Sequence, residues 1–103
     1  MVAYMLFLRE NAVFDPVAMA AYSAANRANA DLFKQHYAIK PLAANGALDA
    51  FEGDLPDALV LLEFPSVAAA RAWYDSPEYQ AAIALRQKGA TYRAILIEGS
   101  PVV

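Results

Sequence analysis

The sequence contains no cysteine. This absence excludes a disulfide scaffold, a thiolate nucleophile and every cysteine-ligated metal site. The chain also lacks a glycine-rich phosphate loop, an HExxH motif and an acidic calcium loop. Its one histidine, His36, has no carboxylate pattern beside it that would complete a metal site. We therefore expect neither a bound metal nor another cofactor.

Charged residues are scarce as well. They make up 18% of the chain, the net charge is −3, and no basic block occurs. The electrostatic signature of a nucleic-acid-binding protein is therefore missing. The apolar run at residues 2–8 is too short to span a bilayer and follows no basic leader. These patterns predict a cytoplasmic protein that has neither nucleic acid nor a membrane as a partner.

Hydrophobic residues are abundant instead, at 59% of the 103 residues. A chain of this length is expected to form a single domain, residues 1–103, with one hydrophobic core. The hydrophobic share lies well above the usual half of a globular chain. We therefore expect part of the apolar surface to be covered by another chain.

The hydrophobic pattern predicts four strands and two helical regions. An N-cap followed by proline, Asp15 and Pro16, starts a long amphipathic helix that should end near residue 36. Pro65 and Ser66 begin the second helical region, and Ser76 with Pro77 begins a further helix that ends near residue 88. The expected strands include residues 2–9, 58–64 and 91–99. Pro41 and the ANG at 44–46 interrupt a poorly periodic region, which predicts a broken or bulged second strand that resumes at Ala47 and closes at Gly53.

The order of these elements is typical of an α+β fold of the ferredoxin-like kind, with a βαββαβ plan. The tripeptides FEG at 51–53 and IEG at 97–99 suggest two similar halves, each ending in a strand. The helices can cover only one face of the four-stranded antiparallel sheet, yet residues 2–9 and 58–64 are apolar on both faces. We therefore expect a homodimer that pairs sheet to sheet.

The run EFPSVAAARAWYDSPEYQAAIALR, residues 63–86, resembles the signature of domain-of-unknown-function family 1330, in the dimeric α+β barrel superfamily. FEGD at 51–54 and IEG at 97–99 extend the resemblance along the chain. It implies the same ferredoxin-like dimer. It also implies kinship with cofactor-free monooxygenases and other enzymes, several of which hold a small molecule between sheet and helices.

One segment departs from the family pattern. Such proteins usually carry a Gly-Gly pair, a basic residue and later an arginine after the first helix, whereas this chain reads HYAIKPLAANG at 36–46. Lys40 stands where the first basic residue is expected, and alanine takes the place of the arginine. A ligand that depends on that arginine is therefore not expected here.

Three side chains of the first helix fall on its apolar arc: Tyr22, Asn29 and His36. His36 has the one side chain whose ordinary pKa lies near neutrality. One interpretation is a core histidine satisfied by a carbonyl and a water. The other is a general base or hydrogen-bond donor that lines a cavity between helices and sheet.

Arg86 falls in the middle of the apolar arc of the last helix, two turns after Tyr79. An unpaired buried charge costs several kcal/mol, so the guanidinium needs a partner. The first interpretation is an intrachain ion pair with Glu63 or Glu98. The second is an arginine that binds the carboxylate of a ligand, with Tyr79 beside it.

Trp73 and Tyr74 are adjacent, so they point about 100° apart on a helix. Tyr74 continues the core stripe of its helix, and Trp73 is expected over the helix junction or the dimer rim. Both are interpreted first as packing residues, and one of them could form an aromatic wall of the cavity.

These residues support three hypotheses. The first is an enzyme that performs cofactor-free acid–base or oxygenase-type chemistry on a small carbonyl, carboxylate or phenolic compound, with His36 as the best catalytic candidate. The second is a non-catalytic or stress-associated protein that binds a small anionic or carbonyl ligand in the same cavity. The third is a structural dimer without a ligand.

Overall fold

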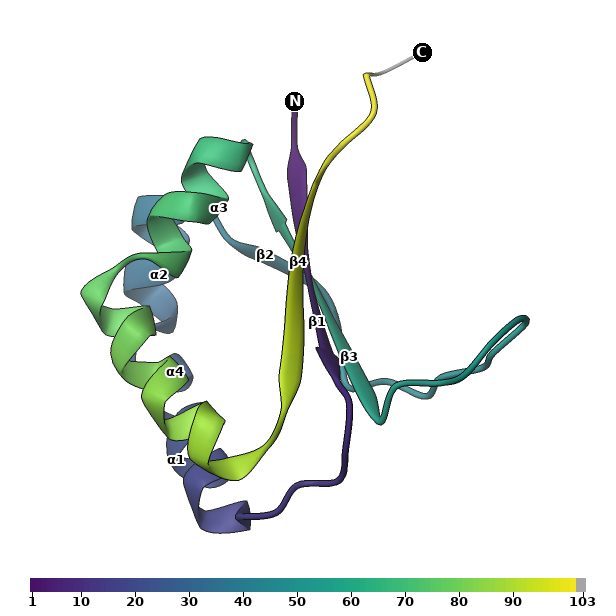
Figure 1. Cartoon of the computed structure of the whole chain (residues 1–103). Helices are drawn as coiled ribbons and strands as arrows, with labels where there is room; N and C mark the ends of the chain where they lie inside the picture. The colour runs from purple at the N-terminus through teal and green to yellow at the C-terminus, as the bar shows by residue number, and fades with distance from the viewer. Residues whose placement is uncertain (102–103) are drawn as a thin grey trace.

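The computed structural model describes residues 1–101 and arranges them as one sheet with helices on one side (Figure 1). The strands are β1 (Ala3–Arg9), β2 (Lys40–Ala44), β3 (Ala58–Phe64) and β4 (Tyr92–Glu98). The helices are α1 (Pro16–Ala28), α2 (Ala30–Tyr37), α3 (Val67–Tyr74) and α4 (Pro77–Gly89). The sheet order is β2-β3-β1-β4, and every neighbouring pair is antiparallel. The predicted ferredoxin-like α+β fold is confirmed.

Side-chain caps fix where the helices begin. The carboxylate of Asp15 accepts from the amides of Val17 and Ala18, directly before α1. The hydroxyl of Ser76 accepts from the amide of Tyr79 and donates to the carbonyl of Trp73, so it caps α4 and ties the start of α4 to the end of α3. These starts agree with the sequence-based boundaries. No helix of the described chain, residues 1–101, has the length and apolarity to cross a membrane.

The first predicted helix is in fact two helices. α1 ends at Asn29, whose φ of −99° and ψ of 5° lie outside the helical range, and α2 begins at the next residue. The backbone N–H and the side-chain amide of Asn29 both donate to the carbonyl of Ala25. An asparagine side chain that competes for backbone groups in this way interrupts a helix. The helical wheel over residues 16–36 still places Leu32 and Phe33 correctly, because both pack in the core.

The predicted irregularity of the second strand is confirmed, since the register of β2 shifts between Pro41 and Ala43. The expectation that this strand resumes at Ala47 and closes at Gly53 is wrong, because β2 ends at Ala44. Asn45 then adopts a left-handed φ of 57°, which turns the chain out of the sheet. Residues 45–57, which we call the arm, extend away from the sheet on the side opposite the helices (Figure 1). FEG lies in the arm and IEG ends β4, so the two tripeptides do not occupy matching strand ends.

The two faces of the sheet differ in what covers them. On the helix side, the side chains of Met5, Phe7 and Phe64 are buried. The other face, which we call the open face, carries the alternate residues of each strand. At its centre, Leu6 lies in register between Leu61 of β3 and Ile95 of β4. Ile95 remains 45% exposed. The chain therefore leaves an apolar sheet face without a cover of its own.

α1 and α4 pack most closely where α4 ends. The carbonyl of Gly89 accepts from the amides of Phe14 and Asp15. A Cβ atom at residue 89 would lie 2.7 Å from Cγ of Met19 and 3.0 Å from the backbone oxygen of Asp15. The helices can approach this closely only because residue 89 has no side chain.

We expect Gly89→Ala to lower the melting temperature by several degrees. Overpacking a close contact costs about 1–3 kcal/mol, which exceeds the roughly 1 kcal/mol that alanine gains over glycine within a helix. Calorimetry of the full chain measures the difference. Gly46→Ala is the matched control, because a Cβ there meets nothing within 4 Å. Equal melting temperatures for the two variants would contradict the close-packing interpretation.

Candidate functional site

An aromatic cluster fills the space between helices and sheet. Trp73 of α3 stacks on Tyr79 of α4, with ring centroids 3.9 Å apart and planes 29° from parallel. Phe33 and Phe7 meet the same two rings edge to face. Trp73 is therefore at the centre of the core and only 3% exposed. The expectation that Trp73 covers the helix junction or the dimer rim is wrong, since Ala70 and Trp73 form the buried stripe of α3.

A cavity of about 300 Å³ adjoins this cluster, between α1 and the sheet. We call it the central cavity. Its lining includes the polar residues Tyr22, Asn26 and Tyr79 and the apolar residues Met19, Leu62 and Trp73. A second cavity of about 320 Å³, the β2-side cavity, shares Asn26, Leu62 and Trp73 with it. The two cavities thus have a common wall.

Arg86 of α4 lies behind the central cavity and is only 6% exposed. Among residues 1–101 it makes no salt bridge, so the predicted ion pair with Glu63 or Glu98 does not form. Its guanidinium carbon instead lies 5.2 to 5.9 Å from the ring centroids of Tyr92, Phe7 and Tyr22. These aromatic faces offset part of the cost of burying the charge. The charge is nevertheless not balanced by a carboxylate.

Two tyrosines connect this charge to the cavity. Nη1 of Arg86 donates to the hydroxyl oxygen of Tyr79 over 3.2 Å, and the hydroxyls of Tyr79 and Tyr22 lie 2.7 Å apart. Because Tyr79 accepts from a cation, its own hydrogen is available to Tyr22. Tyr22 can then donate its hydrogen to an oxygen in the cavity. We call these three residues the relay.

Burial controls the protonation of the relay. Desolvation raises the pKa of Tyr79 far above its ordinary value of 10.0, and the neighbouring Tyr22 raises it further. The positive charge of Arg86 lowers the same pKa, but by less than burial raises it. Tyr79 therefore stays neutral at physiological pH. It acts as a hydrogen-bond donor and not as a base.

Five of the seven predicted site residues line a cavity or support one. Tyr22, Tyr79 and Trp73 line the central cavity, and Arg86 contacts its tyrosines. The helical spacing of residues 79 and 86, two turns apart, places both on one stripe of α4 as expected.

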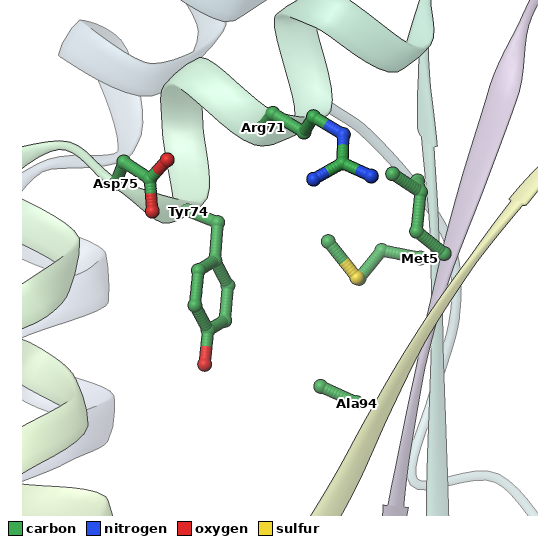
Figure 2. A pocket seen from close by; sticks show the side chains of 6 residues that line it. Met5, Arg71, Tyr74, Asp75 and Ala94 are labelled. Atoms are coloured by element: carbon green, nitrogen blue, oxygen red, sulfur yellow. The ribbon is translucent and has the colours of Figure 1, made fainter.

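Tyr74, the fifth, lines a separate cavity of about 300 Å³ next to β4, the edge strand (Figure 2). We call it the β4-edge cavity. Arg71 and Tyr74 extend from α3 toward Met5 and Ala94 on the strands, as Figure 2 shows. This cavity belongs to the edge of the sheet and is not part of the relay.

The remaining two predicted residues lie outside the cavities. Asn29 caps the junction of α1 and α2, where its side chain donates to the carbonyl of Ala25. His36 is exposed, and none of the three cavities includes it. The expectation that His36 lines the cavity is corrected, because Phe33 and Tyr37, one turn apart, hold the core side of α2 and His36 beside them is exposed.

The sequence analysis missed several polar residues that line the central cavity, among them Ser23, Asn26, Arg27 and Asn45. Of these four, Asn26 is the one with a buried polar atom that has no partner among residues 1–101. It lies one turn after Tyr22 in α1, so the i, i+4 spacing could have identified it. Its Oδ1 atom is buried without a hydrogen-bond partner among residues 1–101, and so is Nε1 of Trp73. Buried polar atoms of this kind are normally satisfied by a ligand or an ordered water. The acceptor Oδ1 of Asn26 and the donor Nε1 of Trp73 therefore have no partner among residues 1–101, and both belong to residues of the wall that the two cavities share.

Comparisons with known proteins agree with the fold. The model of the family described as "Domain of unknown function (DUF1330)" matches residues 3–100. A solved protein of unknown function from Rhodopseudomonas palustris is 23% identical, with a TM-score of 0.69 over 98% of this chain and 84% of that one. A dimeric ferredoxin-like protein of unknown function from Jannaschia sp. CCS1 is 17% identical, with a TM-score of 0.67 over 96% and 100% of the two chains.

An enzyme is similar in fold as well. SnoaB, a cofactor-independent oxygenase from Streptomyces nogalater, is 13% identical, with a TM-score of 0.55 over 99% of this chain and 95% of that one. A comparison with curated proteins gives no match. At these identities the solved structures establish the fold and leave the chemistry to the site itself.

We expect Tyr79→Phe to lower the free energy of unfolding at neutral pH by about 1–3 kcal/mol, because Arg86 and Tyr22 each lose a buried partner. Above pH 10 the unfolded Tyr79 ionises whereas the folded one does not, so wild type should lose about 1.4 kcal/mol per pH unit from this group. The difference between wild type and variant should therefore shrink as pH rises. Urea denaturation at pH 8 and pH 11 tests this, and a constant difference would contradict it.

Proposed function

The chain belongs to the DUF1330 family, whose description names no activity, and we propose its function from the central cavity. We propose that the protein binds a small, largely apolar molecule there through a carbonyl, carboxylate or phenol oxygen. Tyr22 donates to that oxygen, and Arg86 acts on it through Tyr79. The observation that carries the proposal is a buried arginine that has no carboxylate partner among residues 1–101 and is connected by two hydrogen bonds to the cavity.

The electrostatics of the relay favour negative charge on the ligand oxygen. The field of a buried cation is weakly screened, and hydrogen bonds in a chain polarise one another. A donor at the end of such a chain is stronger than an isolated phenol. The ligand oxygen best suited to it carries a full or developing negative charge, as a carboxylate or phenolate does.

The rest of the cavity suits an apolar body. Its wall contains Met19, Leu62 and the indole of Trp73, and its volume of about 300 Å³ is at the lower end for ligand sites. A ligand of one or two rings fits this volume. The unused atoms Oδ1 of Asn26 and Nε1 of Trp73 offer a second polar contact at the wall shared with the β2-side cavity.

The lining favours binding over acid–base catalysis. Within the described residues, neither a carboxylate nor an imidazole lines the central cavity. The described residues that line this cavity therefore provide no general base beside the ligand oxygen. The leading function is therefore ligand binding.

A second candidate is oxygenase chemistry on a phenol that is acidic enough to ionise by itself. The relay would hold the phenolate, and the substrate would supply the electrons that reduce dioxygen. The fold similarity to SnoaB, described as a cofactor-independent oxygenase, supports this candidate.

We also propose that two copies pair through their open faces. Tyr4, Leu6, Leu61 and Ile95 lie on this face and are only partly covered within the chain. Similar solved proteins from Jannaschia and Bacteroides fragilis are described as dimeric. Sheets that pack face to face bury such side chains in a common core. The cytoplasmic location remains a prediction from the sequence.

We expect Tyr22→Phe to weaken ligand binding about tenfold, since it removes one hydrogen bond to a charged oxygen. A thermal-shift screen of small carboxylates and phenols identifies a ligand, and calorimetry of the best one measures affinity. Tyr37→Phe is the control, because Tyr37 packs against the core from α2 and lines none of the three cavities. Equal affinity of Tyr22→Phe and wild type would refute the role of the relay.

Oxygen uptake separates the two candidate functions. Each ligand found in the screen is incubated with the protein in an oxygen electrode. Binding without uptake supports a binding protein. Uptake that falls in Tyr22→Phe supports the oxygenase, whereas uptake equal in Tyr22→Phe and wild type would place that chemistry outside the relay.

We expect Ile95→Asp to turn the dimer into a monomer. A carboxylate at this position would be buried between two apolar sheets, which costs several kcal/mol. Sedimentation velocity at micromolar concentration measures the change. Val17→Asp is the control, because Val17 is 79% exposed on α1, on the opposite side of the molecule. A dimer that persists in Ile95→Asp would exclude the open face as the interface.

A further inference from the structure

The arm presents an aromatic side chain to solvent without any support from its own chain. Phe51 is 91% exposed and Leu55 is 50% exposed. Gly53, with a φ of 79°, turns the chain near the tip. Exposing a phenyl ring costs free energy that burial would recover. The arm therefore carries exposed apolar side chains that are positioned to contact another molecule.

The arm is directed toward the place that a second copy would occupy. It leaves the sheet on the side of the open face, away from the helices (Figure 1). A hairpin with about six residues in each limb reaches roughly 20 Å at 3.3 Å per residue. Two sheets packed face to face lie about 10 Å apart. The tip is thus long enough to pass the edge of a second sheet.

The edge that the arm meets depends on the direction of the twofold axis, which we take to be parallel to the strands. β2, where the arm begins, and β4 are the two edge strands of the sheet. A twofold axis that runs between the sheets, parallel to the strands, places the β2 edge of one copy against the β4 edge of the other. The β4-edge cavity lies at that edge.

The cavity and the arm are complementary. The β4-edge cavity is lined by the apolar side chains of Met5, Ala94 and Leu96, and its volume of about 300 Å³ exceeds that of a phenyl ring. Arg71 and Asp75 also line the cavity, and Arg71 makes no salt bridge within residues 1–101. The arm contains no lysine or arginine, and its acidic residues are Asp49, Glu52, Asp54 and Asp57. Glu52 adjoins Phe51 and matches the charge of Arg71.

We propose that the arm of each copy crosses to the other and inserts Phe51 into its β4-edge cavity. Two arms then clasp the dimer, in addition to the pairing of the open faces. The inference depends on the sheet-to-sheet pairing proposed above. It assigns the occupant of the β4-edge cavity as a side chain of a second copy and not as a small molecule.

The test is a double-mutant cycle on the dissociation constant of the full-length dimer, measured by sedimentation equilibrium. Phe51→Ser removes the ring, and Ala94→Phe fills the cavity from within. Each change should raise the dissociation constant about tenfold or more, and the double variant should be no weaker than the weaker single variant, because both remove the same contact. Phe14→Ser is the control, since Phe14 is 60% exposed before α1 and away from the open face.

The possible outcomes distinguish the two proposals. The clasp is supported if both single variants raise the dissociation constant, their effects are not additive in the double variant, and Phe14→Ser leaves the constant unchanged. An unchanged dissociation constant in Phe51→Ser, or fully additive effects, overturns the clasp while Ile95→Asp still tests the sheet pairing. A wild-type chain that is monomeric at micromolar concentration overturns both. Circular dichroism confirms that each variant is folded.

Discussion

The structure depends on how the positive charge of Arg86 is accommodated inside the protein. A buried guanidinium is stable only where rings and acceptors surround it. Tyr79, two turns earlier on α4, supplies the acceptor, and the rings come from the sheet and from α1. This requirement sets the rotation of α4 about its axis. It also holds Tyr22 of α1 against α4, so the charge and the packing of the two helices are inseparable.

The sheet imposes a second constraint. Its central strands, β1 and β3, have apolar side chains on both faces, yet all four helices lie on one side (Figure 1). The helix side then forms the core and the cavities, and the open face is left for another molecule. The proposed site and the proposed interface are thus on opposite sides of one sheet, and β1 contributes to both.

Local chemistry made much of this predictable from the sequence. Asp15 with Pro16 and Ser76 with Pro77 are strong start signals, and they fixed the phase of α1 and α4 correctly. The phase of α4 then indicated that Tyr79 and Arg86 face the core. The expectation that Arg86 pairs with a carboxylate failed, because aromatic contacts from distant strands leave no signal in the sequence.

The errors have physical causes as well. Asn29 interrupts the first helix through a side-chain bond to Ala25, which a helical wheel does not represent. His36 lies outside the site because Tyr37, the next residue, packs against the core in the last turn of α2. Whether Trp73 or Tyr74 enters the core depends on how α3 packs against Phe33 and Tyr79. These contacts join distant parts of the chain and exist only in the folded protein. The arm was mistaken for a strand, because its apolar residues suit an intermolecular contact as well as a sheet.

The stacking of Trp73 on Tyr79 has a spectroscopic consequence. Trp73 is the only tryptophan of the chain, and its indole lies 3.9 Å from a phenol of the relay and in the wall of the central cavity. The tryptophan fluorescence of the protein therefore reports on a single environment, that of Trp73. Any molecule that enters the cavity changes the surroundings of this single fluorophore, so the native protein carries its own optical reporter for occupancy of the site, without a label or a substitution.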